Sequence, residues 1–183
     1  MLTKNKILDL KGLKKIRQKF IAKKIVLCHG VFDLLHIGHI NYFKSSKKYG
    51  NILVVSVTSD NFVNKGPGRP VFSTNNRLKF LQEIDCIDYI YSSNDLTAEK
   101  VIKNLKPNFY CKGNDYSINL AKNDVNLKKE INALKAFKGK FKVIKEISFS
   151  SSKFINDNNL QNFNQDCKDY INLIRRKYNL DQI

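Results

Sequence analysis

Continuous apolar runs alternate with amphipathic stretches along most of the chain. Runs such as Ile52–Val57 are apolar at nearly every position, which is typical of a strand buried on both faces of a parallel sheet. The stretches between the runs repeat their apolar residues every three or four positions, as one face of a helix does. The pattern predicts strands at 24–28, 51–58, 86–91, 107–111 and 141–144, and helices at 7–20, 39–49, 75–84, 95–105, 126–137 and 150–156.

Strands that alternate with helices in this way predict a Rossmann-like three-layer α/β/α fold with a five-stranded parallel sheet. Residues 1–23 are expected to carry a lead-in helix, and residues 24–156 to form the main domain. Residues 157–183 are expected to form a linker rich in asparagine and a C-terminal helix, in which Tyr170, Ile174 and Tyr178 recur at helical spacing.

Four polar segments follow predicted strands, at residues 28–39, 65–69, 112–116 and 148–153. Ligands of parallel α/β sheets bind at the carboxyl ends of the strands, and these ends share one edge. The four segments are therefore expected to meet there and to form a binding site.

The chain of 183 residues carries a net charge of +17, which suits nucleic acid, acidic lipid or a phosphorylated substrate. Its lysines are scattered, and they do not form a dense basic segment with interleaved aromatic residues. Neither specific nucleic acid binding nor membrane binding is therefore expected, and most of the charge is assigned to a solvated surface.

A cytoplasmic location is expected from three further features of the sequence. The apolar runs are shorter than the roughly 18–20 residues that a membrane span needs. The first residues lack the apolar core of a secretory signal. The four cysteines are far apart and are expected to be reduced; they are Cys28, Cys86, Cys111 and Cys167.

All three histidines of the chain, His29, His36 and His39, lie in the segment 28–39, between a predicted strand and a predicted helix. The start of a helix offers unpaired backbone N–H groups and a favourable dipole to an anion. Gly38 lets the backbone approach a phosphate, and His36 and His39 can donate N–H bonds as negative charge builds in a transition state. Asp33 is expected to hold the turn through bonds to the backbone.

The pattern Gly30-Val31-Phe32-Asp33-x-x-His36-x-Gly38-His39 resembles the signature of the cytidylyltransferase-like nucleotidyltransferases. Within this family the chain is most similar to glycerol-phosphate cytidylyltransferase and to the adenylyltransferase domain of heptose-phosphate enzymes. The resemblance covers about residues 24–156, and it includes Ser56–Asp60, Arg77, Lys112–Tyr116 and Ile147–Ser152.

The resemblance implies that a nucleoside triphosphate, CTP or ATP, is joined with Mg²⁺ to a sugar-phosphate or polyol-phosphate and that pyrophosphate is released. The product would be an activated sugar precursor of cell-surface polysaccharide. Catalysis is expected of His36, His39 and Lys65, and substrate binding of Lys65, Arg69 and Arg77, while no metal is expected to be bound by the protein itself. The nucleotide is expected to be bound by Gly30, Val31, Phe32, His36, Gly38, His39, Lys112, Gly113, Asp115, Ser150, Ser151 and Ser152.

The chain departs from the family pattern at two positions that bear on the acceptor. Asp85 and Lys145 stand where glycerol-phosphate cytidylyltransferases have arginine, so a different acceptor is expected. The tail 167–183 resembles the linker that joins this domain to a carbohydrate kinase in bifunctional relatives. A sugar kinase is therefore expected as a separate protein, or the chain is a fragment of a fusion. Family members are often dimers, so a homodimer is a further expectation.

Three alternatives compete with this interpretation. The letters His-Ile-Gly-His also occur in class I aminoacyl-tRNA synthetases, but the chain leaves no room for a tRNA-binding domain. A nucleotide-sensing or assembly module of the same fold would bind the nucleotide without catalysis. A zinc site made by Cys28, His29, His36 and His39 would match no common structural zinc spacing.

Overall fold

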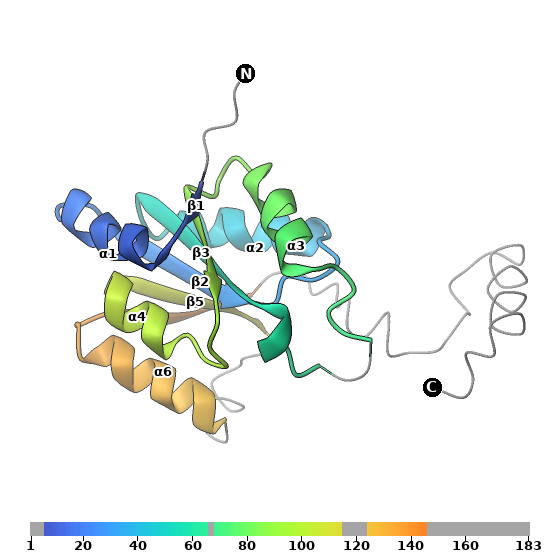
Figure 1. The fold of residues 1–183 in the computed structure, drawn as a ribbon. Coiled ribbons are helices and arrows are strands. Elements are labelled where there is room, and N and C mark those ends of the chain that lie inside the picture. Colours follow the sequence, from blue (N-terminus) through green and yellow to red (C-terminus); the bar gives the residue numbers. More distant parts are fainter. Residues whose placement is uncertain (1–5, 66–67, 115–123, 146–183) are drawn as a thin grey trace, which may run out of the picture. The chain divides into compact units, whose positions relative to one another are not determined.

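A parallel sheet of six strands runs through the computed structural model, which describes residues 6–65, 68–114 and 124–145 (Figure 1). Its strands are β1 (Ile7–Leu8), β2 (Ile25–Gly30), β3 (Ile52–Thr58), β4 (Tyr89–Ser93), β5 (Phe109–Gly113) and β6 (Lys140–Ile144). The helices are α1 (Leu10–Lys19), α2 (Ile37–Lys47), α3 (Thr74–Gln82), α4 (Glu99–Leu105) and α6 (Val125–Lys135), with a short 3₁₀ helix, η1, at Asp60–Phe62.

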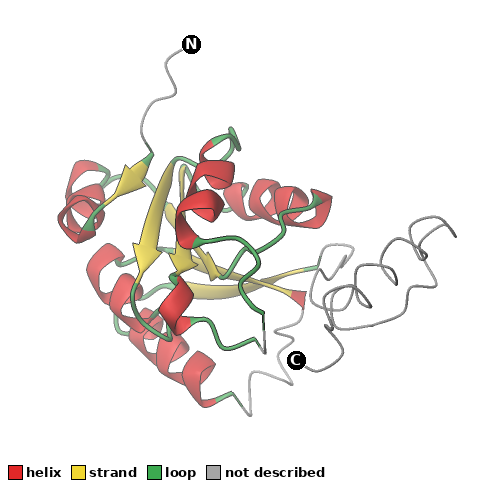
Figure 2. Cartoon of the chain, turned by 45° about the vertical axis from the view of Figure 1, so that its right-hand side comes forward, coloured by secondary structure: helices red, strands yellow, loops and turns green. Residues whose placement is uncertain are grey.

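The helices cover both faces of the sheet, as the sequence predicts (Figures 1 and 2). Helices α1, α4 and α6 pack on one face, and α2 and α3 pack on the other. Alternate residues of β2 serve the two cores: Leu27 joins the first and Cys28 the second, and both are fully buried. The double burial explains why this strand is apolar at successive positions.

The prediction of a helix from residue 7 is wrong at its beginning. Ile7 and Leu8 instead form β1, an edge strand that pairs in parallel with β4. Asp9 then caps α1, since its side chain accepts a hydrogen bond from the backbone N–H of Gly12. The other predicted strands and helices within the described ranges are present, with ends that shift by up to four residues. The predicted helix at 150–156 and the predicted linker and C-terminal helix at 157–183 lie outside the described residues.

The strand order β1-β4-β3-β2-β5-β6 reverses its direction at β2. The chain moves outward from β2 to β3 and β4, and then returns to place β5 on the other side of β2. Ligands in open α/β sheets bind in the crevice at such a switch point, beside the carboxyl ends of the strands. The fold therefore directs attention to the ends of β2 and β5, at His29–Gly30 and Lys112–Gly113.

None of the helices that the structure describes is long and apolar enough to cross a bilayer.

Candidate functional site

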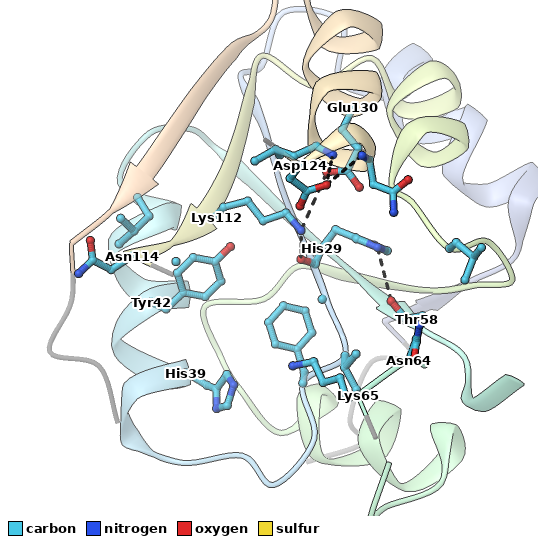
Figure 3. A pocket seen from close by; sticks show the side chains of 18 of the residues that line it. His29, His39, Tyr42, Thr58, Asn64, Lys65, Lys112, Asn114, Asp124 and Glu130 are labelled. Carbon is cyan, nitrogen blue, oxygen red and sulfur yellow. Dashed lines mark hydrogen bonds and ion pairs between the residues drawn. The ribbon is translucent and has the colours of Figure 1, made fainter. Parts of the chain in front are cut away.

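A cavity of about 520 Å³ lies at this switch point (Figure 3). It brings together nine of the residues that the sequence predicts for the site, and they come from β2, the following turn, α2, the loop after η1, and β5. These residues are Gly30, Val31, Phe32, His36, Gly38, His39, Lys65, Lys112 and Gly113.

His36 and His39 form a capping box at the beginning of α2. His36 Nδ1 accepts a hydrogen bond from the Gly38 N–H at 3.1 Å, and His39 Nδ1 accepts one from the His36 N–H at 3.4 Å. An accepting Nδ1 carries no proton, so the proton of each neutral ring is on Nε2. The backbone of the turn therefore fixes the tautomer in which Nε2–H is the donor of each ring.

Burial keeps both imidazoles neutral near pH 7. The pKa of His36 is lowered by burial, and the pKa of His39 is lowered to about 4 by burial and by electrostatic repulsion of its protonated form by the neighbouring His36 and Lys65. The two rings lie close together, with centroids 4.1 Å apart. Two neutral N–H donors side by side can bind an anion without first losing or gaining a proton.

Phe32 and Leu34 take left-handed conformations, with φ of 51° and 48°, and so bend the chain sharply between β2 and α2. Asp33 holds this turn: its two carboxylate oxygens accept the backbone N–H groups of Val71 and Phe72 at 2.8 and 3.0 Å. The structure thus confirms that Asp33 binds backbone. Glycine at position 30 makes room for this turn, because a Cβ atom there would lie only 3.2 Å from the ring of Phe32.

Lys65 and Lys112 bring positive charge to the cavity from two directions. Lys65 comes from the loop after η1 and lies on the same side as His39 in Figure 3. Lys112, at the end of β5, is 6% exposed; its Nζ lies 3.3 Å from the carbonyl oxygen of His29 and 4.0 Å from Oε2 of Glu130. Phosphates that enter the cavity would meet both ammonium groups.

His29 also lines the cavity, although its sequence context suggests a role for it only in the zinc alternative. Its Nδ1 lies 3.1 Å from Oγ of Ser56, and its Nε2 lies 3.5 Å from Oγ1 of Thr58. Burial and the nearby charge of Lys112 lower the pKa of His29 to about 3, so the ring is neutral. The third histidine thus forms part of a neutral polar floor with two hydroxyl groups of β3.

Arg77 is not among the described residues that line the cavity, and its side chain is completely buried. All five of its N–H donors are used within the protein. They bind the carbonyl oxygens of Val31, Thr58 and Phe72, the carboxylate of Asp60 and the hydroxyl of Thr74. The placement of Arg77 therefore does not support the substrate-binding role predicted for it; Arg77 ties together the ends of β2, β3 and α3.

Arg69 is similarly placed away from the cavity lining. Its Nε lies 3.0 Å from Oδ2 of Asp33, and the two side chains are 4% and 1% exposed. Arg69 therefore supports the turn that carries the histidines, and its predicted contact with substrate has no support in this position. Lys47, whose role the sequence leaves open, forms an ion pair with Asp88.

Two sets of residues remain. Asp115, Ser150, Ser151 and Ser152 were predicted to bind the nucleotide and lie outside the described residues. Thr58 and Asn114 also line the cavity, and they lie in the segments Ser56–Asp60 and Lys112–Tyr116 that carry the resemblance. Cavity residues that the sequence did not point to include Tyr42, Phe62, Asn64, Leu96, Asp124, Asn126, Leu127, Glu130 and Ile144. Tyr42 and Glu130 lie within helices, where the rule of strand ends gives no signal.

The described ranges contain no group of three or more His, Cys, Asp or Glu side chains that could hold a metal ion. Two of the four residues considered for zinc lie in different surroundings. Cys28 is in the core under α2 and α3, while His29 faces the hydroxyls of β3.

Comparisons with known proteins agree with this arrangement. The family model described as Cytidylyltransferase-like matches residues 27–157. The "Bifunctional protein HldE" of Geobacter metallireducens is 41% identical over 116 residues, which are 61% of this chain and 24% of that protein. The protein of the same name from Helicobacter pylori strain P12 is 41% identical over 106 residues, which are 57% of this chain and 23% of that protein. The chain thus spans about a quarter of the length of these relatives.

Solved structures show the same fold. The lipopolysaccharide core biosynthesis protein of Thermoplasma volcanium superposes with a TM-score of 0.55 at 27% identity, over 70% of this chain and 99% of that one. The pantoate-beta-alanine ligase of Francisella tularensis superposes with a TM-score of 0.56 over 85% of this chain and 74% of that one. Its identity is only 17%, so it shows the fold alone.

Proposed function

Because the chain belongs to the cytidylyltransferase-like family, we propose that it transfers a nucleotidyl group from ATP or CTP to a sugar-phosphate or polyol-phosphate, with release of pyrophosphate. One observation carries the proposal: two neutral imidazoles lie side by side at a helix beginning, with Nδ1 of each bound to backbone N–H. This arrangement offers two Nε2–H donors and the helix dipole to an anion.

The reaction needs one bond to form and one to break. An oxygen of the acceptor phosphate attacks the α-phosphorus of the nucleotide, and the bond from this phosphorus to the bridging oxygen breaks as its electron pair leaves with pyrophosphate. Such transfers depend on positioning and charge stabilisation more than on covalent help from the protein. His36 and His39 would donate to α-phosphate oxygens, while Gly38 leaves the backbone accessible.

Lys65 and Lys112 would reduce the repulsion between the anionic acceptor and the anionic nucleotide. Both lie in the cavity wall, Lys65 beside His39 and Lys112 at the end of β5. The substrate would be the Mg²⁺ complex of the triphosphate, since Mg²⁺ prefers several phosphate and water oxygens to an all-protein site.

The names of the relatives support a sugar-phosphate acceptor. They are bifunctional HldE proteins and a lipopolysaccharide core biosynthesis protein. We propose that this chain likewise makes an activated sugar for cell-surface polysaccharide. We further propose that a sugar kinase supplies its phosphorylated acceptor, either as a separate protein or as another part of the same polypeptide.

The proposal is tested by incubating the chain with Mg²⁺, with ATP or CTP, and with a panel of sugar-1-phosphates and polyol phosphates, while pyrophosphate release is followed. Release is expected with one nucleotide and a narrow group of acceptors, and omission of the acceptor should abolish it. Nucleotide binding without release from any pair would contradict the proposal and favour a nucleotide-sensing module.

A further inference from the structure

Glu130 is a buried carboxylate in the wall of the cavity, and neither the motifs nor the sequence relatives draw attention to it. It lies on α6, is 4% exposed, and faces the cavity opposite His39 and Lys65 (Figure 3). A carboxylate in a site that receives phosphates opposes their charge, so its position there needs an explanation.

Both oxygens of Glu130 are held by the protein. Oε1 accepts the backbone N–H of Ala98 at 2.7 Å, and Oε2 accepts the hydroxyl of Tyr110 at 2.8 Å. Ala98 is the N-cap residue of α4, and its backbone N–H finds its acceptor in Glu130, on another helix. These two bonds fix the carboxylate between α4 and β5.

The fixed carboxylate lies beside the ammonium group of Lys112. The distance from Nζ to Oε2 is 4.0 Å, which is longer than a hydrogen bond but short enough for a strong charge interaction in a buried place. Both side chains are nearly inaccessible, at 7% and 5% exposure. A buried ammonium without a counter-charge is costly, and the carboxylate of Glu130 is close enough to offset this cost.

The geometry keeps Lys112 at the cavity wall. Its Nζ also lies 3.3 Å from the carbonyl oxygen of His29 and 5.6 Å from the ring centre of Tyr110. Glu130, Tyr110 and the end of β2 therefore all lie close to the same ammonium group. Glu130 therefore stabilises the charge of Lys112 from 4.0 Å, while the ammonium group stays within 3.3 Å of the His29 carbonyl oxygen at the end of β2.

We propose that Glu130 is a positioning residue for nucleotide binding: through Lys112 it keeps a positive charge at the cavity wall, where the phosphates of the nucleoside triphosphate bind. Tyr110 shares this role by holding Glu130. The proposal rests on the nucleotidyltransferase function proposed above, but its own claim concerns the affinity for the triphosphate.

The test is a double-mutant cycle with Lys112→Met, Glu130→Gln and the double variant, measured as the Kd of the Mg²⁺ complex of ATP or CTP, whichever the wild type binds more tightly. The amide in Glu130→Gln keeps an oxygen for the Ala98 N–H and presents an NH2 donor, to which the Tyr110 hydroxyl oxygen can turn as acceptor. The negative charge is lost, so this substitution should weaken binding about tenfold. In the Lys112→Met background it should cause no further loss, because the residue through which it acts is gone.

Tyr110→Phe serves as a second variant if Glu130→Gln does not fold, and its effect should also disappear in the Lys112→Met background. Glu99→Gln is the matched control, since Glu99 is a surface carboxylate on α4 that pairs with Lys103, and it should leave the Kd unchanged. Unchanged affinity in Glu130→Gln, or effects of the two substitutions that multiply, would overturn the proposal.

The two claims can fail separately. A wild type that binds triphosphate and releases no pyrophosphate would overturn the proposed reaction, while the cycle would still decide the role of Glu130. A wild type that transfers the nucleotidyl group but gives an additive cycle would overturn the role of Glu130 alone. A wild type that binds neither triphosphate would overturn both.

Discussion

Two groups of basic side chains follow β2 and β3, and they use their N–H donors in opposite ways. His36 and His39 each use Nδ1 locally and keep Nε2–H as the donor. Arg77 uses all five of its donors inside the protein, and Arg69 pairs with Asp33. A position at the ligand edge of the sheet is therefore insufficient to identify a binding residue. A binding residue must also keep a side-chain N–H donor that the folded protein does not already use.

The two groups depend on each other. Arg77 binds the carbonyl oxygen of Val31, which is a cavity residue at the end of β2, and Asp33 holds the turn that leads to His36. The arginines therefore form a scaffold on which the histidines are presented. Substitutions in the scaffold should lower stability, and substitutions at the cavity should lower turnover.

The largest expected effect is on stability. Arg77→Met should lower the free energy of unfolding by about 3–5 kcal/mol, because it takes the guanidinium donors away from the carboxylate of Asp60 and from three carbonyl groups. Urea unfolding followed by circular dichroism measures this change. Lys79→Met, an exposed change on the same helix, should stay within about 0.5 kcal/mol of the wild type. Equal losses in the two variants would contradict a scaffold role for Arg77.

The next effect is on turnover. His39→Ala should reduce kcat by about 10²-fold or more, since removing one transition-state donor costs roughly 3 kcal/mol. Pyrophosphate release under saturating substrates measures kcat. Lys44→Ala, an exposed change on the same helix, should leave kcat as it is. An unchanged kcat in His39→Ala would remove this ring from the mechanism and erase the contrast with Arg77.

The neutral imidazoles predict a dependence of stability on pH. Unfolded histidine has a pKa near 6.5, whereas the pKa values of His29 and His39 in the folded chain are about 3 and about 4. Protons therefore bind the unfolded chain first as the pH falls, so stability is lost from about pH 6.5 downward and is unaffected by these rings above it.

Between pH 7 and pH 5 this linkage amounts to about 2 kcal/mol for each ring. Urea unfolding at a series of pH values measures the loss, and His29→Asn should reduce it. A free energy of unfolding that stays constant or rises over this interval would show that the rings are not held neutral.

The smallest expected effect is on kcat/KM, and it concerns the loop that carries Lys65 and Arg69. Lys65→Ala should lower kcat/KM about tenfold, because it removes one charge-assisted contact to a phosphate and leaves the backbone of the turn intact. Arg69→Ala, in the same loop, should instead act mainly on stability through the loss of its ion pair with Asp33. Steady-state kinetics and unfolding measured together on both variants separate the two roles.

The sequence predicts the fold well because burial on both faces of the sheet leaves a strong pattern. The five longer strands are found where apolar runs occur. The two residues of β1 are too few to show a strand periodicity, and the pattern instead includes them and Asp9 in a predicted helix. The sequence predicts the turn that carries His36 and His39 because the glycines and histidines that define it lie close together along the chain.

The rest of the site depends on contacts that are distant in the sequence. Glu130 meets Ala98 and Tyr110 only after α4, β5 and α6 are assembled. The engagement of Arg77 likewise depends on carbonyl groups 5 to 46 residues away. Residue type alone could not show that all five N–H donors of this arginine are used within the protein.

The central claim, that the cavity directs attack at the α-phosphorus, is tested most directly with radiolabelled nucleotide. With a phosphorylated acceptor that supports turnover, label in the α-phosphate should appear in the product joined to the acceptor, and label in the γ-phosphate should appear in pyrophosphate. His39→Ala should slow both transfers to the same extent. Label from the γ-phosphate in the acceptor would contradict the account, because it would mean phosphoryl transfer instead of nucleotidyl transfer.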